Sequence, residues 1–235
     1  MSEKTLDFIQ IYYKEEQIGR LYDFAIPYFN ESVTPYFENS VIADLVPESK
    51  ADLISVASWK LKQKRGAISS YATLKAAGGK ELTSERILKT AFDVAILTPR
   101  PAEHKMLFMA RQWHGQVWDD AFSILASFLR HKLQIKVSQE ITLPIYGNHF
   151  IARNLIYHEY VKSCLIPTMD FIEKTADVFT QGAGYRIVKE RLGEFDTLED
   201  YEKVTGRKDW MIGVFLLERL FSIWINDKKM NVINL

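Results

Sequence analysis

Two neighbouring polar residues, Asn148 and His149, carry the chemistry that stands out most in this chain. They interrupt the stretch 146–160, which begins with apolar residues and continues with the composition of a helix. An amide and an imidazole at the junction between a strand and a helix are well placed to contact a ligand in an α/β protein. His158, the second histidine of this stretch, is interpreted as a residue of the helix surface.

Glu218 and Arg219 are adjacent charges inside the strongly apolar helix that we predict over residues 209–225. Neighbours in a helix project about 100° apart, so these two side chains cannot simply pair with each other. An unpaired buried charge is very costly, so each side chain needs its own partner. Two interpretations are equally open. The charges either bind partners within the core and stabilise it, or they extend from the core to contact a ligand.

Three predicted strands end in aromatic, hydroxyl and basic groups. β-Branched and aromatic runs predict these strands over residues 6–13, 51–59 and 92–98. In open α/β sheets, ligands gather outside the carboxyl ends of the strands. Aromatic rings at these ends suit a nucleotide base, and cations suit its phosphates.

Metal chemistry has little support in the sequence. The chain has no Gly-rich phosphate loop, no Gly-x-Ser-x-Gly elbow and no His-Glu-x-x-His motif. Asp119 and Asp120 could hold a divalent cation, but their place early in an amphipathic helix favours a role in offsetting the helix dipole. The five histidines have irregular spacing, and most such histidines are packed or half-exposed: His104, His114, His131, His149 and His158.

Composition predicts one folded domain over residues 1–235, since 47% of residues are hydrophobic and can bury a substantial core. Thirty basic and thirty acidic side chains cancel, so overall charge gives no reason to propose nucleic acid as a partner. The single Cys164 excludes an intrachain disulfide and is expected to be a buried structural thiol. The apolar run 210–217 is far too short for a membrane span. We therefore expect a cytoplasmic protein, with peripheral membrane association left open.

The order of the predicted elements favours an α/β fold with a mostly parallel central sheet flanked by helices. Helices are expected from near Ser40 and over 69–77, 84–91, 103–133 and 150–178, with Pro167 as a break. A short edge strand containing a proline is expected over 139–146. Residues 25–39 and 60–65 are predicted to be irregular, and 185–209 is predicted to be a polar surface excursion with a short helix that begins at Thr197 and ends at Gly206.

Several short segments, taken in order, resemble a family of bacterial glycosyltransferase-like proteins tied to capsule and surface-polysaccharide synthesis. Members of this family resemble the GT-A type of nucleotide-sugar-dependent transferases, which implies a single GT-A-like, Rossmann-like α/β domain. No Asp-x-Asp metal motif follows a strand here, and the family's His-Tyr-Arg-Arg run is missing after the second strand, so a divalent cation stays unassigned. The matching segments are Ser58-Trp59-Lys60, 92–99, Trp113-His114 with the helix after it, 148–151 with Tyr157 and Tyr160, and 216–221.

The resemblance implies transfer of a sugar from a nucleotide sugar to a saccharide acceptor. It implies that Tyr12, Tyr13 and Lys60 bind the nucleotide end of the nucleotide sugar. It also implies that Asp93, Asn148 and His149 line the sugar site, with His149 as a catalytic candidate.

For the charged pair, the resemblance makes Glu218 the base that deprotonates an acceptor hydroxyl. Arg219 would then balance the charge of the diphosphate. The alternative is a non-catalytic protein that binds a saccharide or nucleotide on the same scaffold. A structural subunit of a polysaccharide-assembly complex is the third interpretation.

Overall fold

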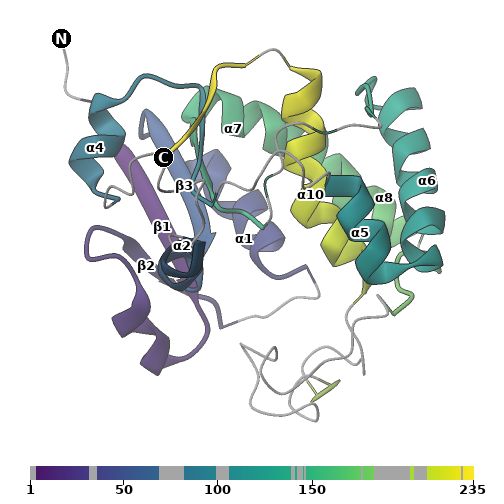
Figure 1. The fold of residues 1–235 in the computed structure, drawn as a ribbon, viewed down its shortest axis with the longest axis horizontal. Helices are drawn as coiled ribbons and strands as arrows, with labels where there is room; N and C mark the ends of the chain where they lie inside the picture. Colours follow the sequence, from purple (N-terminus) through teal and green to yellow (C-terminus); the bar gives the residue numbers. More distant parts are fainter. Residues whose placement is uncertain are drawn as a thin grey trace.

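A mixed six-stranded sheet forms the centre of the computed structural model, with helices on both faces (Figure 1). The strand order is β2-β1-β3-β5-β4-β6. Neighbouring strands pair in parallel, except that β5 is antiparallel to both β3 and β4. This arrangement confirms the predicted α/β fold with a mostly parallel sheet. The structure describes residues 4–31, 36–68, 82–98, 106–138, 141, 145, 147–175, 177–182, 202–203, 211–228 and 230–235.

The strands are short, and the central ones are almost entirely buried. Every residue of β3 and β4 is buried, which fits the near-continuous apolar runs expected of strands covered on both faces. The bounds of the strands are β1 Leu6–Tyr12, β2 Ile26–Phe29, β3 Leu53–Ser58, β4 Val94–Ile96, β5 Phe150–Arg153 and β6 Val232–Asn234.

The helices divide between the two faces of the sheet. Alternate strand residues point to opposite sides, so Ile9 and Ile11 of β1 join one core and Phe8 joins the other. The larger core is covered by α1, α6, α7, α8 and α10, and the smaller one by α2 and α4. The helices are α1 Glu38–Leu45, α2 Leu61–Ile68, α4 Ser84–Lys89, α5 Met106–His114, α6 Gln116–His131, α7 Asn154–Tyr160, α8 Ile166–Lys174 and α10 Ile212–Asp227, with shorter turns η1 Glu15–Arg20, η2 Val46–Glu48 and η3 Val161–Leu165.

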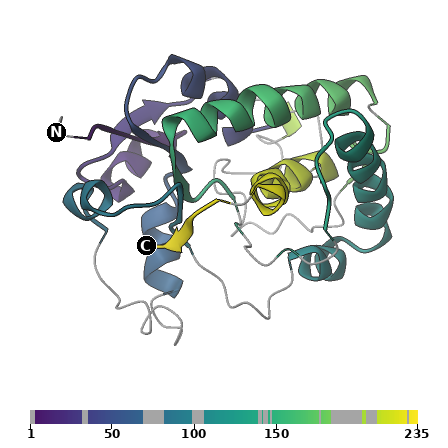
Figure 2. The ribbon, with the colours of Figure 1, turned by 90° about the horizontal axis from the view of Figure 1, so that it is seen from above.

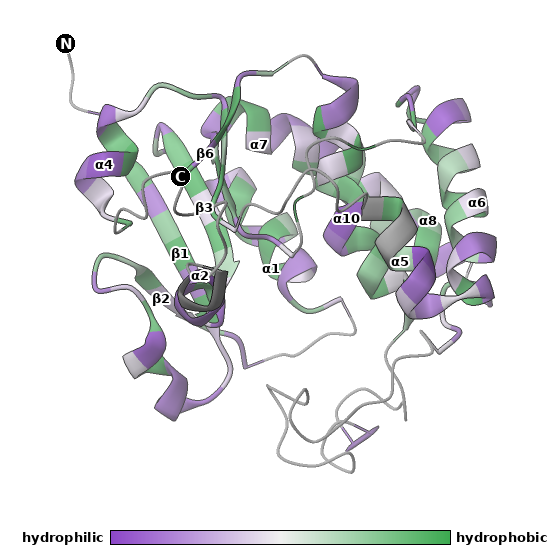
Figure 3. Cartoon of the chain, viewed as in Figure 1, coloured by the Kyte–Doolittle hydropathy of each residue, from purple (hydrophilic) through white to green (hydrophobic). Residues whose placement is uncertain are grey.

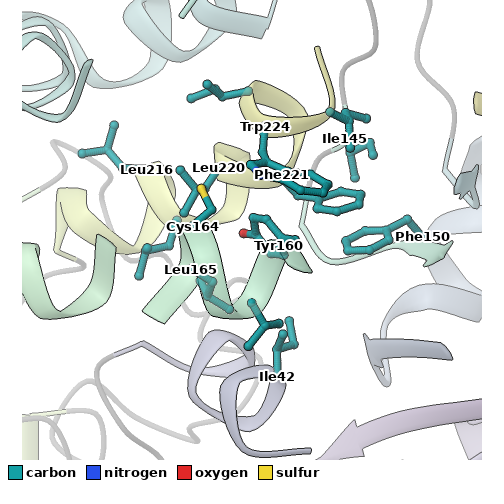
Figure 4. Packing of buried hydrophobic residues seen from close by; sticks show 14 of the residues in the cluster. Ile42, Ile145, Phe150, Tyr160, Cys164, Leu165, Leu216, Leu220, Phe221 and Trp224 are labelled. Atoms are coloured by element: carbon teal, nitrogen blue, oxygen red, sulfur yellow. The ribbon is translucent and has the colours of Figure 1, made fainter. Parts of the chain in front are cut away.

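An aromatic cluster fixes α10 against the sheet and against α7 (Figure 4). Phe221 of α10 stacks on Phe150 of β5, with ring centroids 3.8 Å apart and planes 6° apart. Tyr160 meets Phe221 edge-on at 4.8 Å. Such pairs stabilise by about 0.5–1.5 kcal/mol beyond the area they bury. Cys164 lies in the same core, as predicted, and burial raises the pKa of its thiol.

The helix after β5 runs without a break through α7, η3 and α8, although Pro167 was expected to interrupt it (Figure 2). Proline lacks an N–H, and its ring collides with the carbonyl four residues earlier in a regular α-helix. Here η3 is a π-helical turn, in which the Ile166 N–H bonds to the Val161 oxygen five residues back. The wider turn accommodates Pro167 in the first turn of α8.

Four further expectations differ from the structure. Residues 60–65, predicted as a charged loop, begin α2, because leucine, lysine, glutamine and arginine favour helix and Leu61 and Arg65 share its buried face. The predicted loop 25–39 contains β2. Residues 150–153 form β5 rather than the start of a helix. The helix over 103–133 is divided at Gly115, whose φ of +63° suits glycine.

Other predicted elements are confirmed or lie outside the described residues. The strands over 6–13, 51–59 and 92–98 correspond to β1, β3 and β4. The alternation of hydrophobic and hydrophilic residues along α6 is visible in Figure 3, and α10 is largely hydrophobic. Residues 69–77 and the segment 185–209, apart from 202–203, lie outside the described residues, as does most of the predicted strand 139–146.

Tyr157→Phe is expected to raise the free energy of unfolding by about 1 kcal/mol at pH 7. The Tyr157 hydroxyl is fully buried and has no hydrogen-bond partner within the described part of the chain. Burial also raises its pKa well above the ordinary value of 10.0. The unfolded chain therefore loses this proton first as pH rises past 10, so the advantage of the variant grows in alkali by about 1.4 kcal/mol per pH unit.

Urea unfolding at pH 7 and at pH 10.5 measures both effects. Tyr28→Phe, on the edge strand β2, is the control and is expected to change stability by less than about 0.5 kcal/mol. A loss of stability in Tyr157→Phe at pH 7 would show that the hydroxyl is satisfied in solution.

Candidate functional site

Residues 147–149 lie beside the carboxyl ends of the parallel strands β1, β3 and β4. This end of the sheet is called the carboxyl edge below. Because β5 runs antiparallel to β3 and β4, its beginning lies beside their carboxyl ends. The Leu97 N–H donates to the His149 oxygen at 2.9 Å, which continues this pairing beyond β4. On the other side, the Trp59 N–H donates to the Ile11 oxygen at 2.9 Å, so the ends of β1 and β3 are level.

His149 is held between the ends of two strands and is only 2% exposed. Its Nε2 lies 3.5 Å from the Ser58 hydroxyl oxygen, and its Nδ1 lies 3.5 Å from the Thr98 hydroxyl oxygen. Gly147 packs against the imidazole: a Cβ at this position would lie 3.7 Å from His149 Cε1, and its φ of +64° favours glycine. The ring is therefore oriented by β3, β4 and the turn before β5.

Asn148 is the polar side chain at this edge that points most clearly to a ligand. It is 6% exposed, and no hydrogen bond to its amide is formed by the residues that the structure describes. An amide offers both donors and an acceptor, so the hydroxyl groups of a ligand would satisfy it.

Glu218 precedes the two residues of α10 that contact Ile145 and Phe150. Three residues after it, Phe221 stacks on Phe150. Four residues after it, the Ser222 hydroxyl accepts the Ile145 N–H at 2.7 Å and donates to the Ile145 oxygen at 3.2 Å. Residues three and four apart share a helix face. The Glu218 side chain is one-third exposed, so its carboxylate reaches solvent.

Arg219 lies in the interface between α10 and α6 instead. Its guanidinium is 5.2 Å from the Trp118 ring centroid, and its Nη1 donates to the Phe215 oxygen at 2.6 Å. The Glu218 carboxylate is 3.9 Å from Nη1, at the long limit of an ion pair. Of the two interpretations of this pair, Arg219 fits the core-stabilising role and Glu218 the role at a site. The predicted contact of Arg219 with a diphosphate receives no support from this placement.

The residues predicted for the nucleotide end lie at the carboxyl edges of β1 and β3. Tyr12 packs its ring on Phe29 of the edge strand, with centroids 5.2 Å apart. Tyr13 is buried, and its N–H donates to the Gln17 side chain at 2.8 Å. The Lys60 ammonium lies 5.3 Å from the Trp59 ring centroid.

Asp93 does not lie with Asn148 and His149. It comes immediately before β4, at the opposite edge of the sheet, where its carboxylate accepts the Asn231 N–H at 3.0 Å. The same carboxylate is 3.5 Å from the Arg153 Nε. The whole length of β4 separates Asp93 from Thr98 and His149, so Asp93 joins strands rather than lining the predicted sugar site.

A groove of about 560 Å³ opens at this opposite edge. Two of its charged groups have partners within the protein: Asp52 accepts hydrogen bonds from the N–H and the hydroxyl of Thr5 at 2.8 and 3.0 Å, and Arg153 pairs with Asp93. His158 also lines this groove, away from His149. The carboxyl edge is taken as the candidate site because three parallel strands end there beside Asn148 and His149.

Arg20 and Arg65 are residues at this edge that sequence reasoning missed. The Arg20 guanidinium lies 5.1 Å from the Trp59 ring centroid. Arg65 is buried, and its Nη1 donates to the oxygens of Leu97 and Leu235, each at 2.6 Å. The charge of residues 60–65 suggested a solvated loop, although a buried arginine can tie α2 to the ends of two strands.

No group of three or more histidine, cysteine, aspartate or glutamate side chains among the described residues is arranged to hold a metal ion. Asp119 pairs with Arg111 at 2.9 Å, and Asp120 accepts a hydrogen bond from Gln116 at 2.8 Å. None of the described helices has the length and apolarity needed to cross a membrane.

Comparisons with protein-family models, curated proteins and solved structures find no match to this chain.

Arg219→Ala is expected to lower the free energy of unfolding by about 2 kcal/mol or more, because it removes a buried cation–π contact and the packing of the side-chain stem. Glu218→Gln, at a partly exposed neighbour, is expected to change it by less than about 0.5 kcal/mol. Chemical denaturation of the two variants measures the difference. Equal losses would contradict the assignment of Arg219 to the helix interface and of Glu218 to the site.

Proposed function

We propose that the protein is a nucleotide-sugar-dependent glycosyltransferase, or a relative of one, that acts on a saccharide acceptor. The observation that carries the proposal is the Asn148 side chain, which lies at the carboxyl edge of the sheet, is 6% exposed and forms no hydrogen bond with the described residues. Ligands of α/β proteins gather at this edge. A sugar supplies hydroxyl groups that can both donate to and accept from an amide.

The residues around Asn148 support distinct roles in such a reaction. His149, held between Ser58 and Thr98, presents a fixed imidazole to the donor sugar. Glu218 is the candidate base: its carboxylate takes the proton of an acceptor hydroxyl as that oxygen attacks the anomeric carbon. The bond from the anomeric carbon to the diphosphate oxygen breaks, and the nucleotide diphosphate leaves.

The resemblance of short segments to capsule and surface-polysaccharide proteins supports the wider setting. In this proposal the reaction takes place in the cytoplasm, and the product enters a bacterial surface polysaccharide. Peripheral association with a membrane is compatible with this setting.

A second candidate function is binding of a saccharide or nucleotide without catalysis. The feature that favours it is the absence of any Asp-x-Asp sequence in the chain, the motif with which metal-dependent sugar transferases of the GT-A type hold their cation. Both candidates use the same edge of the sheet, so turnover is what separates them.

Glu218→Gln is expected to lower the rate of sugar transfer by about 100- to 10,000-fold, because general base catalysis contributes this much. His149→Ala is expected to impair transfer as well. The measurement is product formation from a panel of UDP- and GDP-sugars with saccharide acceptors, with and without manganese.

Asp170→Asn removes a carboxylate from the exposed surface of α8 and is the matched control. If Glu218→Gln and His149→Ala both retain the wild-type rate, the assigned roles are wrong. Binding of nucleotide sugars by a wild-type protein that never turns them over would favour the binding-only function.

A further inference from the structure

Two cations cover the indole of Trp59, immediately beyond the carboxyl end of β3. The Arg20 guanidinium lies 5.1 Å from the ring centroid, and the Lys60 ammonium lies 5.3 Å from it. A third cation is close by in the chain: Lys62 lies 5.6 Å from the Tyr22 ring centroid and donates to the Leu21 oxygen at 3.3 Å. Positive charge and aromatic rings are therefore gathered between η1 and the start of α2.

Arg20 and Lys62 form no ion pair with a carboxylate of the described residues. Their positive charges are therefore not neutralised within that part of the chain. An arginine at such a position offers a planar fork of donors that matches two phosphate oxygens.

Trp59 gives an independent indication of a ligand. Its side chain is 95% buried, since its relative exposure is 5%, and its indole N–H has no hydrogen-bond acceptor in the described residues. Indole nitrogen is a donor only, so the group that would satisfy it must carry an acceptor oxygen. Phosphate oxygens are such acceptors.

The cluster adjoins the candidate site. The Lys60 N–H donates to the Ser58 hydroxyl at 3.3 Å, and the same hydroxyl oxygen lies 3.5 Å from His149 Nε2. Ser58 therefore links the cationic cluster on one side to the histidine and the neighbouring Asn148 on the other. A ligand that carries a diphosphate next to a sugar would span both.

We propose that Arg20, Lys60 and the indole N–H of Trp59 form the diphosphate site of a nucleotide ligand. This inference rests on the proposed function, because it takes the Asn148–His149 edge as the sugar site. Arg20 here supplies the charge balance that sequence reasoning assigned to Arg219. On binding, the exposed Arg20 side chain moves from the indole to the phosphate oxygens, which also accept the Trp59 N–H.

Isothermal titration of the full chain with UDP, GDP, inorganic pyrophosphate and UMP tests the site. Both nucleoside diphosphates and pyrophosphate are expected to bind, and UMP is expected to bind more weakly. Arg20→Ala is expected to weaken UDP binding by about tenfold, because it removes a guanidinium that would bind two phosphate oxygens. Trp59→Phe keeps an aromatic ring without the N–H and is expected to weaken UDP binding also.

Arg130→Ala is the matched control, since it removes an equal charge from the exposed surface of α6. It is expected to leave UDP binding unchanged. The proposal is overturned if no diphosphate binds to the wild-type protein, or if Arg20→Ala binds UDP as tightly as Arg130→Ala does. Circular dichroism of each variant verifies that a loss of binding is not a loss of fold.

The transfer assay separates this inference from the proposed function. Sugar transfer that survives Arg20→Ala with an unchanged KM overturns the diphosphate site and leaves the transferase intact. Arg20-dependent UDP binding by a protein that transfers no sugar supports the diphosphate site and counts against the transferase.

Discussion

The antiparallel course of β5 between β3 and β4 is the constraint on which the candidate site depends. A parallel strand at this place would carry its first residues to the opposite edge of the sheet, beside Asp93 and Arg153. Because β5 runs the other way, Asn148 and His149 precede it at the edge where β1, β3 and β4 end. The same pairing brings the hydroxyls of Ser58 and Thr98 to the two ring nitrogens of His149.

Packing in the hydrophobic core fixes the position of α10 relative to this end of the sheet. Phe221 stacks on Phe150, and Ser222 is bonded to both backbone groups of Ile145, so α10 is fixed on either side of the Asn148–His149 turn. The π-helical turn η3 keeps the long helix continuous past Pro167, and Tyr160, just before this turn, packs against Phe221. A carboxylate on this face of α10 is thereby positioned by packing rather than by a mobile loop.

Much of the scaffold could be predicted from the sequence, because β1, β3 and β4 are β-branched or aromatic runs and α6 has a clear apolar stripe. The candidate turn could also be found, since Asn148 and His149 interrupt an apolar stretch. The direction of β5 could not, because four residues are too few to show a period, and Phe150 and Ile151 fit a helix equally well. Its direction decides which polar groups meet, so the sequence put Asp93 on the wrong edge.

The partners of the buried arginines could not be predicted from the sequence, although a role in the core was one of the two interpretations of Arg219. Arg219 and Arg65 each bond to backbone oxygens inside the protein, and this choice depends on neighbours that are distant in sequence. Local composition indicates only that an arginine is near apolar residues or in a basic run. Arg20 was missed for the same reason, because its contact with Trp59 joins two loops 39 positions apart in the chain.

We propose that ligands bind where β1, β3 and β4 end. The decisive experiment is a crystal structure of the protein soaked with a UDP-sugar. We expect density for the diphosphate beside Arg20 and Lys60 and density for the sugar within hydrogen-bond distance of the Asn148 amide. Ligand density confined to the groove at the opposite edge, beside Lys50 and Arg153, would contradict it.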